Sequence, residues 1–385
     1  MSKATSGPDV PTPVSRGPIV GSRWLTPPGS VLTVRAAMAV TPLNRPDSGR
    51  DGNPLSPSVA NWESIVGPVH PFLDRVTRRL HEQIASFDPE IAEYARYALD
   101  NQGKQLRPAL VALAGSTVGE LNDDLVTVAV VIEMVHLATL VHDDIMDGAE
   151  LRRRRPTMAA QWGNEVSVLL GDCLFAHALR LAASFPTPAV CRAVSEATLQ
   201  VCTGEILQTH RRRRWTVGRD EYFKVLEMKT AELFALACEL GGLLAGAVPA
   251  QQASLRRYGL KLGTAYQVYD DCLDLYGSER IAGKSLGTDL ATGKVTLPLL
   301  TFLERSNPAD RAEMLGWLEQ WDPAHFVGVR ALLEQHGALD ESVKVISALL
   351  EEARMALAGL PNPAPVRALD SLTGFLFQQT AALGV

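Results

Sequence analysis

The sequence predicts an all-α protein in which one large helical bundle spans residues 61–385. Apolar residues recur at helical spacing from Trp62 onward, no segment alternates as a half-buried strand does, and no Asn-Gly dipeptide marks a hairpin. Hydrophobic residues make up 46% of the chain, which is enough to bury a large core. Several segments are apolar on more than one face, so we expect the central helices to be enclosed by other helices.

Residues 1–60 differ in composition from the rest of the chain. Ten of the 24 prolines lie there, among Gly, Ser and Arg and without a sustained period. Such a segment buries too little apolar surface to offset the entropy of ordering, so we predict a Pro-rich disordered tail. A cleaved targeting peptide is the alternative; Asp9, Asp47 and Asp51, and the lack of an apolar segment before a small-residue cleavage site, argue against it.

The helices of the bundle are expected in succession. Segment 70–87 places Phe72, Val76, Leu80 and Ile84 four residues apart, on one helical face. The same kind of pattern continues through segments 89–100, 107–118, 125–144, 164–185 and 220–246. Proline is common at helix starts, and three prolines occupy positions where a start is expected: Pro89, Pro108 and Pro156.

Charge and cysteine content exclude several classes of protein. A net charge of −6 argues against nucleic-acid binding, which needs a basic face. The five cysteines are odd in number and never in C-x-x-C spacing, so a disulfide framework and a zinc site are excluded and a cytoplasmic location is expected. The two longest apolar runs are interrupted by Glu133 and His136 and by Glu239, so no membrane span is predicted.

Two aspartate clusters carry the main functional indication. Asp143 and Asp147 share a helical face, with Asp144 beside them, in the pattern D-D-x-x-D. Taken alone, such a triplet also fits a solvated acidic surface. The pattern occurs again at the end of another apolar segment, at Asp270, Asp271 and Asp274. Two carboxylate clusters that face each other favour divalent cations, and Mg²⁺ prefers one or two carboxylates together with substrate phosphates.

Basic residues accompany both clusters. Lys104 and Arg107 lie at an expected helix start, where backbone N–H groups also favour anions. The others follow the first cluster or lie in the segments MKTAELF and 282–298: Arg152, Arg153, Lys229, Lys284 and Lys294. Arg binds diphosphate oxygens through paired hydrogen bonds and Lys binds as a point charge, so a phosphate-bearing ligand is indicated. The four arginines at 211–214 are interpreted as a solvated loop, with ligand binding as the alternative.

These motifs together resemble the trans-isoprenyl diphosphate synthases, also called polyprenyl synthetases. The resemblance runs in order through GKQLRP, HLATLVHDDIMDGAELRR, GEILQ, KTAELF, YQVYDDCLDLYG and GKSLGTDLATGKVTLP, over residues 103–300. It implies an isoprenoid synthase type of bundle around a deep central cavity, with the two aspartate motifs facing across its mouth. The implied reaction is the Mg²⁺-dependent head-to-tail condensation of isopentenyl diphosphate with an allylic diphosphate primer.

The resemblance also implies the role of each residue. About three Mg²⁺ ions would be bound by Asp143, Asp147 and Asp270. The residues expected in catalysis are Asp143, Asp144, Asp147, Lys229, Asp270, Asp271 and Lys284. The allylic diphosphate would be bound by Arg152, Lys229, Thr230, Gln267, Lys284 and Lys294, and isopentenyl diphosphate by Lys104, Arg107, His136 and Arg153. A homodimer is implied in the same way.

The sequence departs from the family pattern at two positions. Gln105 replaces the arginine of the usual GKRLRP, and Arg154 replaces the glycine of the usual LRRG-x-PT. Lys104 and Arg107 are retained, so we expect anion binding to survive the first change. Arg154 puts the local turn in doubt.

Product length should depend on the residues that precede Asp143. In the resembled family a large aromatic four or five positions earlier closes the pocket, whereas this chain has Ala138 and Thr139. Met134 lies deeper, and Phe175 of a neighbouring helix is the candidate floor. We therefore predict an all-trans product of medium to long chain, of the kind used for quinone side chains. A simple packing role for Ala138 is the alternative, and geranylgeranyl diphosphate is the alternative product.

Other protein classes explain the motifs less well. A class I terpene cyclase needs neither GKQLRP nor a second D-D-x-x-D, and a head-to-head condensing enzyme is expected to carry D-x-x-x-D instead. A non-catalytic partner subunit of a heteromeric synthase would tolerate lost aspartates, but both triplets are intact here.

Overall fold

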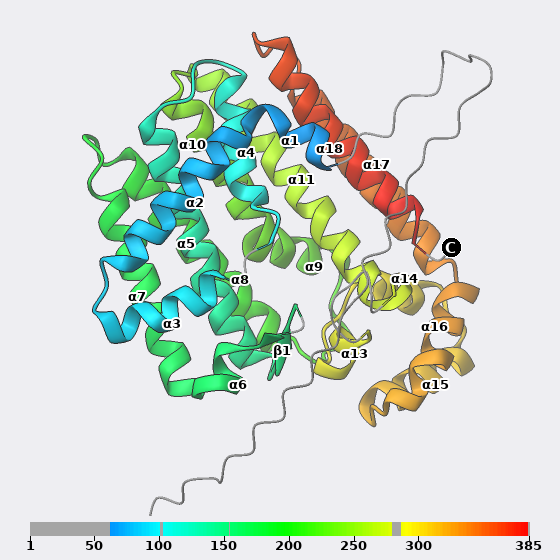
Figure 1. Ribbon diagram of the computed structural model, residues 1–385. Coiled ribbons are helices and arrows are strands. Elements are labelled where there is room, and N and C mark those ends of the chain that lie inside the picture. The colour runs from blue at the N-terminus through cyan, green and yellow to red at the C-terminus, as the bar shows by residue number, and fades with distance from the viewer. Residues whose placement is uncertain (1–61, 101–102, 154, 279–285, 384–385) are drawn as a thin grey trace, which may run out of the picture. The chain divides into compact units, whose positions relative to one another are not determined.

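The computed structural model describes residues 62–100, 103–153, 155–278 and 286–383, which belong to one compact unit, Pro57–Val385. The predicted tail, Arg154 and Lys284 lie outside the described residues. The described chain is helical nearly throughout, which confirms the all-α class (Figure 1). In chain order the helices are α1 Trp62–Val66, η1 Gly67–Val69, α2 His70–Ala85, α3 Pro89–Leu99, α4 Leu106–Ser116, α5 Asp123–Met146, α6 Met158–Trp162, α7 Asn164–Ala182, α8 Ala189–His210, α9 Arg219–Leu226, the π-helical turn η2 Glu227–Ala231, α10 Glu232–Leu244, α11 Pro249–Tyr276, α13 Thr288–Thr292, α14 Leu297–Arg305, α15 Pro308–Glu319, η3 Pro323–His325, α16 Phe326–Gln335, α17 Ala338–Ala356 and α18 Pro363–Ala381.

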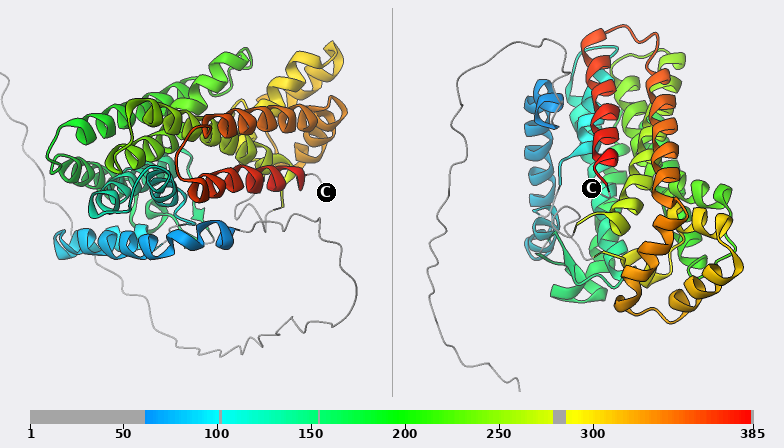
Figure 2. Two further views of the ribbon diagram at one scale, coloured as in Figure 1. Left: turned by 90° about the horizontal axis from the view of Figure 1, so that it is seen from above. Right: turned by 90° about the vertical axis from the view of Figure 1, so that its right-hand side faces the viewer.

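Helices α4, α5, α10 and α11 form the centre of the bundle. Helix α10 packs against α4, α5 and α11, while α2 and α7 pack on α5 and α17 packs on α11 (Figures 1 and 2). Gly241 allows α10 to approach α4, because a Cβ atom at this position would lie 2.6 Å from the carbonyl oxygen of Val111. This packing explains why α4 and α10 are apolar on more than one face, as the sequence predicts.

Helix α5 leads directly to the first aspartate motif. Asn122 caps its start, accepting a hydrogen bond from the Leu125 N–H at 2.9 Å. By length and composition this 24-residue helix could cross a membrane, contrary to the expectation that Glu133 and His136 interrupt the apolar run. However, 72% of its most apolar window is buried inside the protein. Core packing therefore accounts for its hydropathy.

A short hairpin follows the first motif, where the sequence predicts no strand. Strand β1, Leu151–Arg152, pairs antiparallel with β2, Arg155–Pro156. The expectation that Pro156 begins a helix is thus wrong, because it lies in β2, and the Thr157 side chain caps α6 by accepting from the Ala160 N–H at 3.1 Å. The hairpin was missed because each strand is only two residues long, too short for an alternating pattern.

Candidate active site

The first aspartate motif lies at the C-terminal end of α5, where each carboxylate faces a different cation. Asp144 accepts from Arg152, at 2.9 Å from Nε and 2.7 Å from Nη2. Asp147, the C-cap residue of the helix, is 2.9 Å from the Lys294 Nζ. Asp143 is 3.8 Å from the Lys229 Nζ. The structure therefore brings three of the predicted diphosphate-binding cations to the first motif.

The second motif lies on the last turns of α11, and its three aspartates differ in their surroundings. Asp271 is buried and accepts from the Tyr222 hydroxyl at 2.6 Å and from the Gln267 amide at 2.9 Å. Asp274 is fully buried and accepts from the Thr288 hydroxyl at 2.7 Å and the Asp289 N–H at 3.0 Å. Asp270 is partly exposed. Asp274 thus anchors the turn before α13, whereas Asp270 remains accessible.

The π-helical turn η2 connects the two motifs. Lys229, on this turn, forms an ion pair with Glu205, donates to Gln208 at 2.9 Å and faces Asp143. Its neighbour Thr230 donates to Gln267 at 2.8 Å, and Gln267 donates in turn to Asp271. Turns of this type often mark functional sites, because the extra residue redirects adjacent side chains. Here it directs Lys229 to the first motif and Thr230 to the second.

Glycine at position 204 makes this connection possible. A Cβ atom there would lie 2.7 Å from the backbone nitrogen of Lys229, so only glycine lets α8 approach η2 this closely. The contact places Glu205 and Gln208, both in the GEILQ segment of α8, against the Lys229 ammonium.

A second basic group surrounds His136 on α5. Burial lowers the pKa of His136 well below its usual value, and the charges of Arg107, Arg152 and Arg153 lower it further. The imidazole is therefore neutral beside three guanidinium groups, an arrangement that favours a bound anion. Two of the predicted residues of the isopentenyl diphosphate site, Arg107 and Arg153, thus act on the charge of a third, His136.

Aromatic rings position Arg107 of this group and also Lys104, which precedes it in the chain. Arg107 lies over the Phe234 ring at 5.0 Å, and Lys104 lies over the Phe375 ring of α18 at 5.6 Å. Gln105, which replaces an arginine of the family pattern, donates to the Thr77 hydroxyl at 2.8 Å instead. The replacement therefore ties the start of α4 to α2 and leaves Lys104 and Arg107 in place.

The aspartates differ in their affinity for protons. Burial raises the pKa of Asp143 to about 6, although Lys229 opposes the shift. Burial raises the pKa of Asp271 to about 8, and the charge of Asp289 adds to it against the hydrogen bonds from Tyr222 and Gln267. Burial also acts to raise the pKa of Asp147, but Lys294, Lys229 and Arg212 together outweigh it and the pKa falls below its usual value. Cation binding at Asp143 should therefore release a proton below about pH 6.

The chemistry of the donors fits a hard divalent cation. The six aspartates of the two motifs offer carboxylate oxygens, which suit Mg²⁺ or a similar ion. Within the described residues, no group of three or more Asp, Glu, His or Cys side chains forms a ready-made metal site. Mg²⁺ usually takes one or two carboxylates and completes its coordination with phosphate oxygens and water.

The residues predicted to set product length lie on α5 and α7, which pack together. Ala138 and Met134 are fully buried in the core of the bundle. Thr139 donates its hydroxyl hydrogen to the His136 carbonyl at 2.7 Å. The Phe175 ring lies against the His142 ring, with centroids 5.8 Å apart. Phe175 therefore occupies the helix next to α5, and its role as a floor stays a prediction.

The likeness to known proteins agrees with this geometry. The sequence profile of the polyprenyl synthetase family matches residues 88–333. The chain belongs to this family. The predicted enzyme class, a trans-prenyltransferase, is thereby confirmed. The similarity also extends beyond the motifs, over most of the length of related enzymes.

This chain is similar in sequence to two characterised polyprenyl diphosphate synthases and in structure to one solved polyprenyl synthase. Nonaprenyl diphosphate synthase of Mycobacterium tuberculosis is 35% identical over 78% of this chain and 90% of its own. Octaprenyl diphosphate synthase of Escherichia coli is 34% identical over 74% of this chain and 88% of its own. Polyprenyl synthase of Caulobacter crescentus, solved with calcium and isoprenyl diphosphate, has 33% identity and a TM-score of 0.79 and covers 84% of this chain and 99% of its own.

Four residues of the site were not assigned from the sequence of this polyprenyl synthetase: Glu205, Gln208, Arg212 and Asp289. The GEILQ segment was noted without a role, and its spacing gave no sign that α8 would reach η2. Asp289 lies 3.6 Å from Lys294. This contact depends on how the segment before α14 folds, which the sequence pattern does not show.

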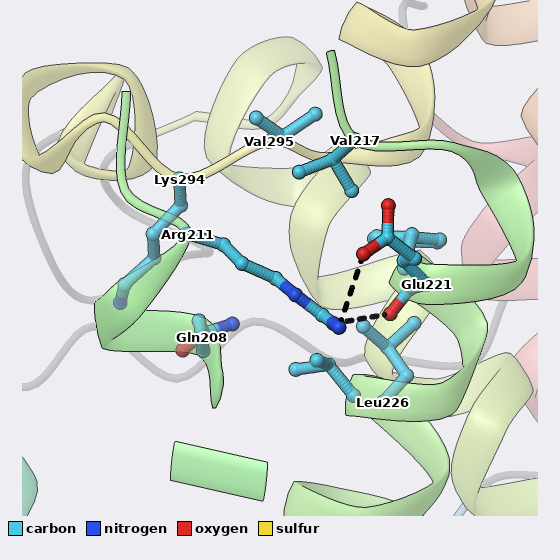
Figure 3. A pocket seen from close by; sticks show the side chains of 9 residues that line it. Gln208, Arg211, Val217, Glu221, Leu226, Lys294 and Val295 are labelled. Carbon is cyan, nitrogen blue, oxygen red and sulfur yellow. Dashed lines mark hydrogen bonds and ion pairs between the residues drawn. The ribbon is translucent and has the colours of Figure 1, made fainter. Parts of the chain in front are cut away.

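The interpretation of the arginines at 211–214 as a solvated loop is wrong for two of them. Arg212 binds Asp147 at 2.6 Å. Arg211 crosses a small pocket to Glu221 at 3.1 Å, with Gln208 and Lys294 on the opposite side of that pocket (Figure 3). Arg213 and Arg214 are exposed, as expected.

Proposed function

We propose that this polyprenyl synthetase condenses isopentenyl diphosphate with an allylic diphosphate primer, in successive head-to-tail steps, to an all-trans product of medium to long chain. The observation that carries the proposal is the η2 turn, which connects the two aspartate motifs through Lys229 and Thr230. The basic group around His136 supplies a second anion site on the same helix as the first motif.

The first motif and its cations bind the primer in this proposal. Asp143, Asp147 and Asp270 would hold about three Mg²⁺ ions, with phosphate oxygens completing the coordination. When bound, these ions neutralise the leaving diphosphate, which lowers the barrier to breaking the allylic C–O bond. Lys229 and Lys294 face the same carboxylates and stabilise the same developing charge.

The group around His136 orients the second substrate. Arg107 and Arg153 hold its diphosphate while the neutral His136 imidazole donates a hydrogen bond without adding charge. The isopentenyl double bond then attacks the allylic carbon, the carbon–carbon bond forms, and the proton lost from the product passes to the released diphosphate. The protein supplies position and charge, so no nucleophilic side chain is required.

Product length follows from the side chains below the first motif. Ala138 is a small residue about one turn before Asp143, where a large aromatic would close a product pocket in this proposal. Met134 lies one turn deeper on α5. The named octaprenyl and nonaprenyl relatives support a long product over geranylgeranyl diphosphate.

We also propose a homodimer that acts in the cytoplasm. Helices α7 and α8 pack together and expose large apolar side chains, with 64% of Leu169 and 68% of Ile206 accessible. Apolar side chains gathered on neighbouring helices are typical of a surface that a second subunit covers. All five cysteines are unpaired, which supports a reducing compartment.

The decisive experiment supplies the purified protein alone with isopentenyl diphosphate, farnesyl diphosphate and Mg²⁺, and reads product masses. Products longer than geranylgeranyl diphosphate that disappear with a chelator and with Asp143→Asn support the proposal. Products no longer than geranylgeranyl diphosphate would favour the alternative product. No product from the isolated chain, but activity after addition of a second polypeptide, would favour a subunit of a heteromeric synthase.

A further inference from the structure

The turn after α8 is fixed against two other segments. The Arg213 N–H donates to the Gly293 carbonyl at 2.7 Å, and the Arg211 guanidinium donates to the Glu221 carbonyl at 3.1 Å. Gly293 is required for this contact, because a Cβ atom there would lie 2.5 Å from the Arg213 Cγ. The turn therefore holds the backbone of Arg212 beside the segment that carries Lys294.

Arg212 extends from this turn to the end of α5. Its Nη2 lies 2.6 Å from the Asp147 Oδ1, and its Nη1 donates to the Met146 carbonyl at 3.2 Å. The Lys294 Nζ binds the other oxygen of the same carboxylate at 2.9 Å. Arg212 and Lys294 thus flank one carboxylate from two different loops, and Lys294 is already placed among the diphosphate-binding residues.

The guanidinium of Arg212 retains binding capacity that the protein does not use. Its Nε is buried and has no hydrogen-bond partner among the described residues. A buried donor without a partner costs stability unless a ligand satisfies it, so the arrangement indicates an acceptor that is still to bind. A divalent ion on Asp147 would also repel the guanidinium from that carboxylate, since both are cations.

We propose that Arg212 is a further binding residue for the allylic diphosphate. In the free enzyme it neutralises Asp147; in the loaded enzyme its donors turn to phosphate oxygens at the same place. Arg is suited to this exchange because its planar fork binds carboxylate and phosphate equally well. The inference rests on the proposed function, because it requires the diphosphate of the primer to lie at the first motif.

The test compares Arg212→Gln with Arg214→Gln, which removes the same charge from an exposed position of the same turn. Isothermal titration with pyrophosphate at saturating Mg²⁺ measures binding without catalysis. Arg212→Gln should weaken pyrophosphate binding about tenfold, the usual effect of losing a hydrogen bond to a charged group, and Arg214→Gln less than about twofold. The KM for farnesyl diphosphate should rise in parallel while the KM for isopentenyl diphosphate stays within about twofold of wild type.

Equal pyrophosphate affinity of the two variants would overturn the proposal, because any loss of binding would then reflect only the lower net charge. Tighter binding by Arg212→Gln would also overturn it, since Arg212 would then only compete with the metal for Asp147. If Arg212→Gln does not fold, Arg212→Lys decides by the same criterion, with a loss smaller than tenfold but larger than that of Arg214→Gln expected. A wild-type protein that binds magnesium pyrophosphate yet makes no product would refute the proposed function and leave the binding comparison valid.

Discussion

Replacing Asp274 should disturb the protein in a different way from replacing Asp270, although both belong to one D-D-x-x-D motif. The Asp274 carboxylate is fully buried and accepts hydrogen bonds from Thr288 and from the Asp289 backbone. The backbone carbonyl of Asp274 also accepts a hydrogen bond from the Gly287 N–H at 2.9 Å. Asp274→Ala removes the carboxylate and frees the turn that leads to Lys294, so we expect lower stability and weaker primer binding.

The magnitude follows from the two bonds to the carboxylate. A hydrogen bond to a charged group contributes roughly 1.5–3 kcal/mol. The donors are partly exposed and can bind water after the substitution, so each bond counts at the lower end of this range. The free energy of unfolding should therefore fall by about 3 kcal/mol for the two bonds. For a domain of this size that corresponds to a melting temperature lowered by about 5 °C, measured by differential scanning calorimetry without Mg²⁺. The KM for the primer should rise because Lys294 loses its fixed position.

Asp270→Ala is the matched control, since it removes the same side chain one turn earlier on α11. It should leave the melting temperature within about 1 °C of wild type and abolish most activity, because Asp270 is partly exposed and assigned to metal binding. The reasoning is refuted if Asp274→Ala melts like wild type and its defect is cured by excess Mg²⁺, as expected of a metal ligand.

Three further predictions concern other parts of the chain. Burial, and then the charge of Arg180, lower the pKa of His177 to about 4 in the folded protein, so the unfolded chain binds the proton more tightly. Stability should therefore fall from about pH 6.5 to pH 4, by roughly 1–2 kcal/mol after allowance for solvent screening of the imidazole, and calorimetry of His177→Gln should show a smaller loss. Ala138→Tyr should shorten the product by mass spectrometry, and an unchanged product distribution would remove Ala138 from the account of chain length. Leu169→Lys should shift a dimer toward monomer in light scattering, whereas Val327→Lys, at a more exposed apolar position of α16, should not.

The sequence indicated the fold and the reaction because both depend on local patterns. Helical spacing from Phe72 onward predicted the bundle, and the repeated D-D-x-x-D with its cations predicted a phosphate-bearing ligand. The reaction followed from the family resemblance of the same motifs. Arg152, Lys229 and Lys294, all expected at the allylic diphosphate, each contact a carboxylate of the first motif. A motif whose residues all lie on one helix can be recognised from the sequence without knowing which other helices pack against it.

The errors have a common cause, which is that long-range packing leaves no local pattern. Four consecutive arginines favour solvent by charge alone, yet the backbone of Gly293 fixes their turn so that Arg212 reaches Asp147. The hairpin that contains Pro156 likewise forms from strands too short to alternate.

The second aspartate motif separates the two kinds of information most clearly. By itself the sequence determined that Asp270, Asp271 and Asp274 follow an apolar helix and that carboxylates at this spacing suit a hard cation. Only the tertiary structure decided that they differ, because Asp274 is enclosed by the turn before α13 while Asp270 stays accessible. Burial and hydrogen-bond partners are properties of the folded chain, and they decide whether a carboxylate is enclosed and anchors a loop or stays exposed to solvent.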